Sequence, residues 1–299
     1  MVVRRGATKE ASKIREAQKR IHPVDEDFQY LNMLVYGKPK KGKTTFGASG
    51  PKPVLIVDCN EHGTLSVRRF SQVEVFRLEE WKDIDLVYWF LHKGDHQFKT
   101  VVIDTVTSLA QLCMKFVLGD EVARDPTKDP VMASKREWGK VAQLMGTEIL
   151  KFRNLPMHTV FLAQERRGFS EDDEEAPEVM PAVSPSVQNQ LTPAVDIIGR
   201  IYVKEVVTKG KGDEEPKGKG EYEHRMLIGD HEVYTTGDRS DAGLPKVLRL
   251  NGDKTTQLER LVARIKNYKE GASGNTNGKQ DTPPSRTRPR SQRRPQRAQ

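Results

Sequence analysis

The chain carries Gly37-Lys38-Pro39-Lys40-Lys41-Gly42-Lys43-Thr44, which fits the pattern G-x-x-x-x-G-K-[ST] of a phosphate-binding loop. Glycines let backbone N–H groups curl around phosphate oxygens, and a helix that follows would turn its positive end toward the same anion. We expect Lys43 to reach the β- and γ-phosphates and the Thr44 hydroxyl to ligate Mg²⁺. Together with Thr45, the sequence therefore predicts a nucleoside triphosphate site on residues 37–45.

The segments on both sides of this loop support the prediction. The apolar run 31–36 ends at Gly37 and is typical of a strand, and residues 43–49 can open a helix. Strand, glycine-rich loop and helix, in that order, are the context that the motif requires. The competing interpretation of the same residues is a surface loop rich in lysine and glycine.

Beyond the loop, apolar runs of strand length alternate with helical patterns. The runs 53–58, 100–104 and 157–164 are apolar nearly throughout, which is typical of strands buried on both faces of a parallel sheet. A further strand is expected at 72–76, and helices are expected at 9–20, 80–93, 108–118 and 133–154. This alternation predicts an α/β fold with a mainly parallel sheet flanked by helices.

The pattern changes after Gln164. An acidic stretch, 171–175, is followed by strand-like runs at 196–207, 221–228 and 232–236, and then by a final helical pattern at 255–268. The strand-like runs predict an antiparallel extension over about 196–250. The expected organisation is a charged arm (1–27), one domain (28–270) that holds the phosphate-binding loop, the antiparallel extension and the final helix, and a tail (271–299) that cannot form a core.

Composition places the excess charge at one end of the chain. Of the net charge of +8 over 299 residues, +6 falls in residues 271–299, which carry seven basic residues and one acid. A flexible polycation of this kind binds nucleic acid without sequence preference, or is merely a solubilising terminus. We find no apolar run long enough for a membrane span and no secretory signal, and Cys59 and Cys113 lack metal or disulfide spacing, so we expect a reduced, cytoplasmic protein.

Polar residues at the ends of the apolar runs supply candidate chemistry. Asp104 closes the run 100–104 and is the expected carboxylate that holds Mg²⁺ through water, although it could also cap the helix that follows. Asp58 and Glu61 follow the apolar residues 53–57, and either could be the base or water-orienting group. Gln164 ends the fourth run and could contact the γ-phosphate.

In this order, the loop, the Asp58–His62 segment, the Asp104–Leu109 segment and Gln164 resemble the RecA-type ATPase core over about residues 31–205. The resemblance implies ATP and Mg²⁺ as ligands, Glu61 as the catalytic carboxylate and Gln164 as the γ-phosphate sensor. More narrowly, the chain resembles compact phage-encoded nucleotide-binding proteins, which include single-strand annealing recombinases. For such a protein we expect a slow or DNA-stimulated ATPase that acts on single-stranded DNA, assembles as a homo-oligomer and has a single-strand-binding protein as a further partner.

Several features depart from that pattern and keep alternatives open. One more residue than in RecA separates Asp58 from Glu61, and the acidic stretch 171–175 is a poor partner for DNA phosphates. DNA would then be held by Arg166, Arg167 and other surfaces, and Arg239 is a candidate contact to a neighbouring subunit. A nucleotide-dependent switch or loader that binds a protein is the main alternative, and a small-molecule kinase is the next. Thr105, directly after Asp104, argues against AAA+ proteins, which usually place a glutamate there.

Overall fold

A computed structural model describes residues 3–21, 30–168, 177–206 and 221–268. The acidic stretch 171–175 and the tail 271–299 lie outside these ranges. The helices are α1 (Val3–Arg20), α2 (Lys43–Gly47), α3 (Asp83–Lys93), α4 (Val106–Arg124), α5 (Lys135–Arg153), α6 (Pro185–Leu191) and α7 (Gln257–Lys266), with short 3-10 helices η2 (Gly63–Val67) and η3 (Thr192–Ala194).

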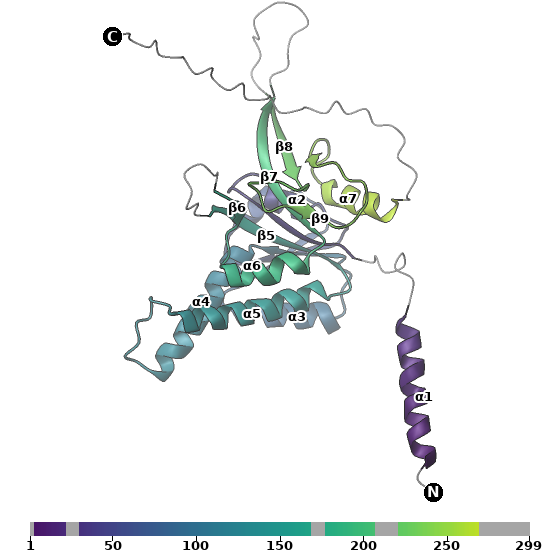
Figure 1. The fold of residues 1–299 in the computed structure, drawn as a ribbon. Coiled ribbons are helices and arrows are strands. Elements are labelled where there is room, and N and C mark those ends of the chain that lie inside the picture. The colour runs from purple at the N-terminus through teal and green to yellow at the C-terminus, as the bar shows by residue number, and fades with distance from the viewer. Residues whose placement is uncertain (1–2, 22–29, 169–176, 207–220, 269–299) are drawn as a thin grey trace, which may run out of the picture. The chain divides into compact units, whose positions relative to one another are not determined.

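One sheet organises the described residues from 30 onward (Figure 1). Its strands are β1 (Asn32–Gly37), β2 (Val54–Asp58), β3 (Val73–Arg77), β4 (Thr100–Asp104), β5 (His158–Arg167), β6 (Val179–Pro181), β7 (Ile197–Val206), β8 (Glu221–Leu227), β9 (Gly237–Asp238) and β10 (Val247–Arg249). The main order is β10-β8-β7-β1-β5-β4-β2-β3, and the neighbours from β7 to β3 are parallel. The predicted mainly parallel sheet is therefore confirmed.

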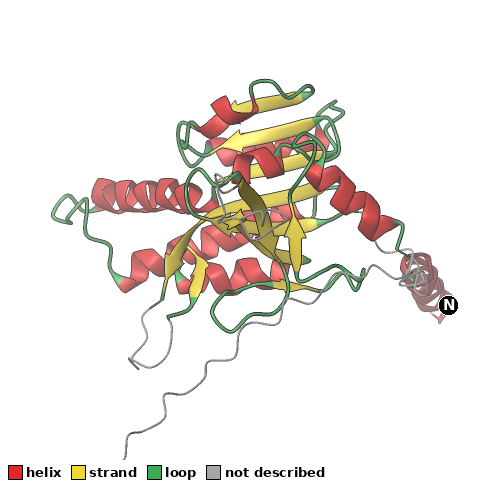
Figure 2. Ribbon diagram, turned by 90° about the horizontal axis from the view of Figure 1, so that it is seen from above, coloured by secondary structure: helices red, strands yellow, loops and turns green. Residues whose placement is uncertain are grey.

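Both faces of the sheet are covered, which explains why the central strands read as continuous apolar runs. β2 and β4 are buried at every residue. Alternate strand residues pack against α3–α6 on one face and against α2 and α7 on the other. Figure 2 shows these helices, in red, against the yellow strands. Because each fully buried Val, Leu or Ile contributes about 1.5–3 kcal/mol, the strand order is held mainly by these two cores.

The antiparallel extension is present as predicted. β8 pairs antiparallel with β7, and β10 pairs antiparallel with β8, so the extension continues the edge of the parallel sheet. The expected strand at 232–236 was wrong, because only Tyr234 forms a bridge there, to Val179. The segment pairs with β6 at this one residue, so it does not form a strand ladder.

Helix ends follow local capping chemistry. Ser134 and Glu137 form a capping box at the start of α5, and the Thr105 hydroxyl accepts the backbone N–H of Ser108 at the start of α4. Thr105 rather than Asp104 is therefore the cap of α4. The final helix, expected at 255–268, forms over Gln257–Lys266 and buries Leu258, Leu261, Val262 and Ile265 as its spacing predicts.

Candidate functional site

The loop after β1 owes its shape to two glycines. Gly42 adopts φ +95°, a left-handed conformation that other residues rarely take. A Cβ on Gly37 would lie 2.4 Å from the carbonyl oxygen of Ile201 in β7, so the close approach of two strands requires glycine. The helix that follows, α2, has only five residues and ends two residues before the end of the expected 43–49. Lys43 and the loop's backbone groups, rather than a long helix, are thus the main groups offered to an anion here.

A cavity of about 570 Å³, which we call the P-loop cavity, opens beside this loop. The described residues that line it are Pro39, Lys40, Gly42, Lys43, Thr44, Thr45, Glu61, His62, Gly63, Ser66, Asp104, Gln164 and His224. Sequence reasoning selected the loop residues, Glu61, Asp104 and Gln164 among them. It assigned no role to His62, Ser66 or His224, and no pattern in the sequence marks these three residues.

Lys43 is buried and its ammonium group is fully engaged. Its Nζ donates to the carbonyl oxygens of Gly37 (2.9 Å) and Lys38 (3.1 Å) and to Oε1 of Gln164 (2.9 Å). Burial lowers the pKa of Lys43, and the nearby carboxylates of Asp104 and Glu61 oppose this only in part. The lysine is therefore held at the mouth of the loop by acceptors that an incoming anion could replace.

Thr44 and Asp104 meet across the sheet. The Thr44 hydroxyl donates to Oδ2 of Asp104 at 2.7 Å, and Asp104 is 4% exposed. Burial raises the pKa of Asp104 from 3.8 to about 6, and the Thr44 hydrogen bond opposes the rise. Mg²⁺ is commonly held by one or two carboxylates, waters and substrate phosphates, with a loop hydroxyl in this motif, and this pair of oxygen donors fits that requirement. Within the described ranges no cluster of three or more His, Cys, Asp or Glu offers a rival cation site.

The two acids after β2 occupy different environments. Asp58 is 1% exposed, accepts the backbone N–H groups of Glu61 (2.9 Å) and His62 (3.1 Å), and faces Arg77 at 3.3 Å. It shapes the turn and does not line the P-loop cavity. Glu61 does line the cavity, so Glu61 and not Asp58 lies beside the loop.

Hydrogen bonds hold the Glu61 carboxylate in place. Its Oε1 accepts from the hydroxyls of Thr105 (2.9 Å) and Ser108 (2.7 Å). Burial raises the pKa of Glu61, but hydrogen bonds from Ser108, Thr105 and Gln164 outweigh burial, and the net pKa lies below its usual value. Glu61 is therefore ionised near neutral pH. Sequence reasoning missed Thr105 and Ser108 as its partners, although hydroxyl residues directly after Asp104 were the available signal.

Gln164 connects the two charged groups. Its Oε1 accepts from Lys43 Nζ at 2.9 Å, and its Nε2 donates to both carboxylate oxygens of Glu61 at 3.4 Å. The sheet accounts for this position, because β5 lies between β1 and β4 and Gln164 is in register with Gly37. A side chain here necessarily stands between the loop and the residues around Asp104.

The arginines expected to act outside the site show different contacts. Arg239 pairs with Asp196 at 3.0 Å and donates to the carbonyl oxygen of Pro193, so its guanidinium is engaged within its own chain. Arg166 and Arg167 lie near the end of β5, where β5 pairs with β6, and Arg167 is exposed. Arg166 Nε is buried and has no hydrogen-bond partner among the described residues.

A protein-family model described as "AAA domain" matches residues 29–240. The chain belongs to this family. The residue after Asp104 is Thr105 rather than the glutamate usual in AAA+ proteins, and the match shows that this does not keep the chain out of the AAA-domain family. At this position the Thr105 hydroxyl donates a hydrogen bond to Glu61.

Two solved structures are similar to this AAA-family chain. The flagellar accessory protein FlaH from Methanocaldococcus jannaschii is 8% identical, with a TM-score of 0.36, over 73% of this chain and 84% of that one. The RadB recombinase is 17% identical, with a TM-score of 0.37, over 76% and 89%. Likenesses this distant do not bear on what the chain does. No curated protein matches the sequence. Among the helices of the described ranges, none is both long and apolar enough to cross a membrane.

Proposed function

We propose that this AAA-family protein binds ATP with Mg²⁺, hydrolyses it, and uses the cycle to act on single-stranded DNA. The observation that carries the ATPase part is the placement of Gln164, whose amide bonds Lys43 on one side and Glu61 on the other. Lys43, which we assign to the phosphates, and the ionised Glu61 thus line the same cavity, and both form hydrogen bonds with Gln164. In this proposal residues 28–270 form the ATPase domain, flanked by an arm (1–27) and a tail (271–299).

Each residue of the site has a chemical role in this proposal. Residues 37–45 bind the phosphates, and Lys43 neutralises their charge. Thr44 and Asp104 hold Mg²⁺, Asp104 through water, and the ion when bound neutralises phosphate charge. Glu61 is ionised and therefore able to accept a hydrogen bond from a water molecule, which it orients for attack.

Gln164 relays the nucleotide state in this proposal. All three N–H groups of the Lys43 ammonium are engaged, one of them by Oε1 of Gln164, so a phosphate that replaces this acceptor would release the Gln164 amide. The freed amide would then shift relative to Glu61 and to the start of the segment 165–167. This supports a link between the nucleotide and the end of β5, where Arg166 and Arg167 lie.

The DNA part of the proposal rests on charge. Arg167 is exposed at the end of β5, and seven basic residues follow Gly271 in the tail, outside the described residues. Such groups bind phosphates of any sequence and release counterions as they do so. A homo-oligomer with ATP at subunit interfaces, and a single-strand-binding protein as partner, belong to the same proposal.

A nucleotide-dependent switch that binds a protein is the second candidate. Five consecutive carboxylates at 171–175, a few residues after Arg166 and Arg167, favour this candidate. They would repel DNA phosphates. A basic protein surface would be attracted by the same charges.

An ATPase assay with and without single-stranded DNA separates the two candidates. Stimulation of wild-type turnover by DNA, with no turnover in Glu61→Gln at any DNA concentration, is the expected result. A turnover rate that is unchanged by single-stranded DNA would contradict the proposed action on DNA and favour the protein-binding switch. A fully active Glu61→Gln variant would contradict the proposed site itself.

A further inference from the structure

A second, smaller cavity adjoins the P-loop cavity, and neither Glu61 nor Gln164 lines it. It measures about 150 Å³ and shares Gly42, Thr45, Ser66 and His224 with the larger cavity. Beyond these it is lined by Lys41, Phe70, Leu250, Lys254 and Gln257. We call it the side cavity. A ligand whose phosphates lie on the loop has its remaining body close to this opening.

The walls of the side cavity are fixed to the loop by hydrogen bonds. Ser49, just after α2, accepts the backbone N–H of Leu258 at its Oγ (2.9 Å) and that of Glu259 at its carbonyl oxygen (3.0 Å). The first turn of α7 is thereby attached to the end of the P-loop helix. His224 reaches the other side, with Nδ1 3.3 Å from the carbonyl oxygen of Lys41.

The floor of the side cavity is apolar. Phe70 and Leu250 are half-buried and pack against the core under α2 and α7. Leu250 is held at its position because its backbone N–H donates to the carbonyl oxygen of His224 at 2.9 Å. Two apolar side chains beside a few polar groups, with Lys41 and Lys254 also lining the cavity, are suited to a heteroaromatic ligand that carries phosphates.

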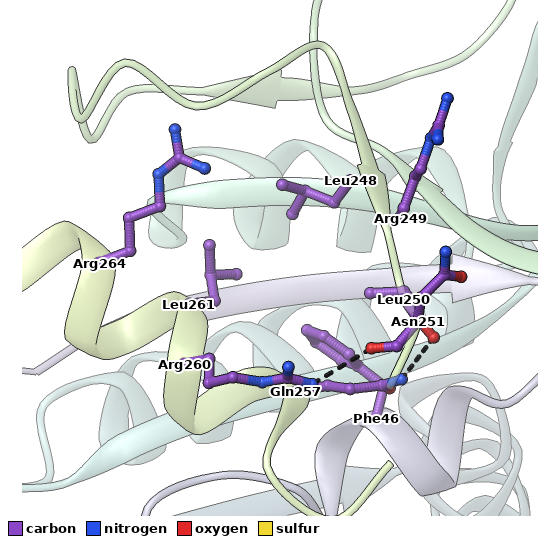
Figure 3. A pocket seen from close by; sticks show the side chains of 9 residues that line it. All are labelled: Phe46, Leu248, Arg249, Leu250, Asn251, Gln257, Arg260, Leu261 and Arg264. Atoms are coloured by element: carbon purple, nitrogen blue, oxygen red, sulfur yellow. Dashed lines mark hydrogen bonds between the residues drawn. The ribbon is translucent and has the colours of Figure 1, made fainter. Parts of the chain in front are cut away.

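Gln257 supplies the polar group with a defined orientation. Its Nε2 donates to the carbonyl oxygen of Leu250 at 2.7 Å, and Figure 3 shows this bond joining α7 to the segment after β10. A carbonyl oxygen requires a donor, so this bond decides which end of the amide faces Leu250. The oxygen Oε1 and the second N–H of Gln257 have no other hydrogen bond among the described residues.

We propose that the side cavity holds the base of the nucleotide and that Gln257 selects adenine. Glutamine pairs with adenine through its amide oxygen and one N–H, which meet the amino group and a ring nitrogen. Guanine presents an oxygen where adenine presents the amino group, so an amide of fixed orientation cannot satisfy both bases in one pose. The inference rests on the proposed function, because it assumes that the P-loop cavity takes the phosphates.

The proposed base site is supplied partly from outside the family match. Leu250 and Gln257 lie beyond residue 240, where the match to the AAA domain ends. Base selectivity would therefore be a property of this chain's own segment after β10 and of helix α7, and the phosphate chemistry would belong to residues within the match.

Competition binding with four ligands tests the inference. The full-length protein is measured with ATP, GTP, purine riboside triphosphate (ATP without its amino group) and inorganic triphosphate. We expect wild-type protein to bind ATP about tenfold more tightly than GTP and than purine riboside triphosphate. In Gln257→Leu these differences should fall to about twofold or less, while the affinity for inorganic triphosphate is unchanged. Glu259→Gln, an exposed change on the same helix, should behave as wild type.

The outcomes separate this inference from the function on which it rests. If wild-type protein binds ATP, GTP and purine riboside triphosphate equally, the base site is refuted and the phosphate site stands. Equal selectivity in wild type and Gln257→Leu would likewise refute the role of Gln257. If inorganic triphosphate and all nucleotides fail to bind, the proposed function fails and the base site with it. The comparison of ligands on wild-type protein needs no variant to fold.

Discussion

Replacing Asp104 with asparagine should stabilise the nucleotide-free protein and at the same time remove its Mg²⁺-dependent function. Asp104 is 4% exposed, and burial raises its pKa from 3.8 to about 6. At about 1.4 kcal/mol per pKa unit, the ionised carboxylate lowers the free energy of unfolding by about 3 kcal/mol. Asparagine removes the charge and still offers an oxygen to the Thr44 hydroxyl.

The sign follows from the direction of the pKa shift. A carboxyl group whose pKa is raised by folding contributes stability below its unfolded pKa, near 4, and that contribution is lost as the pH rises through about 6. The advantage of Asp104→Asn should therefore be largest at pH 8, smaller at pH 5 and near zero at pH 4. Since the amide also has N–H groups to satisfy, we expect a net gain of about 1–3 kcal/mol, or roughly 3–10 °C in melting temperature.

Thermal unfolding of both proteins at pH 5 and pH 8, without nucleotide, measures this gain. Mg²⁺ and ATP should then raise the melting temperature of wild type but not of Asp104→Asn. Asp58→Asn is the matched control, because Asp58 is equally buried but accepts two backbone N–H groups and faces Arg77. That control should lose about 2 kcal/mol. A loss of stability in Asp104→Asn at pH 8, or an equal gain at both pH values, would refute the reasoning.

Three further predictions concern binding and turnover. Lys43→Ala should abolish ATP hydrolysis and weaken ATP binding, measured by competition, because the variant lacks the buried ammonium group proposed to neutralise the phosphates; full activity would contradict the P-loop assignment. Glu61→Gln should bind ATP normally but lose about 10²–10⁴-fold in single-turnover rate, and if Asp58→Asn shows this behaviour instead, the assignment of the two acids is reversed. Deleting residues 271–299 should weaken DNA binding and reduce its salt dependence while sparing basal turnover. An unchanged salt slope in filter binding would show that the tail does not contact DNA.

The positions of the strands could be predicted from the sequence where the strands are completely buried. Strands buried on both faces, such as 100–104, are apolar nearly throughout, so their positions follow from the local run of apolar residues. The segment 232–236 was expected to be a strand, but Tyr234 alone forms a bridge there, to Val179, and the local sequence does not record whether a partner strand is available. The helix α6 was missed as well, although Pro185 at its first position was a usable signal.

By itself the sequence determined the loop 37–45, the parallel sheet and the polar residues at the ends of the apolar runs, because each is encoded by local pattern. Only the tertiary structure shows that Glu61 lines the P-loop cavity and Asp58 does not, since Asp58 ends the same strand that Glu61 follows and the two differ in the neighbours that surround them. The same holds for Gln164, which joins Lys43 to Glu61 because β5 is inserted between β1 and β4. It holds again for Gln257, brought beside the loop by Ser49 from more than 200 residues away. Contacts between distant segments depend on strand order and helix docking, and no local pattern records these.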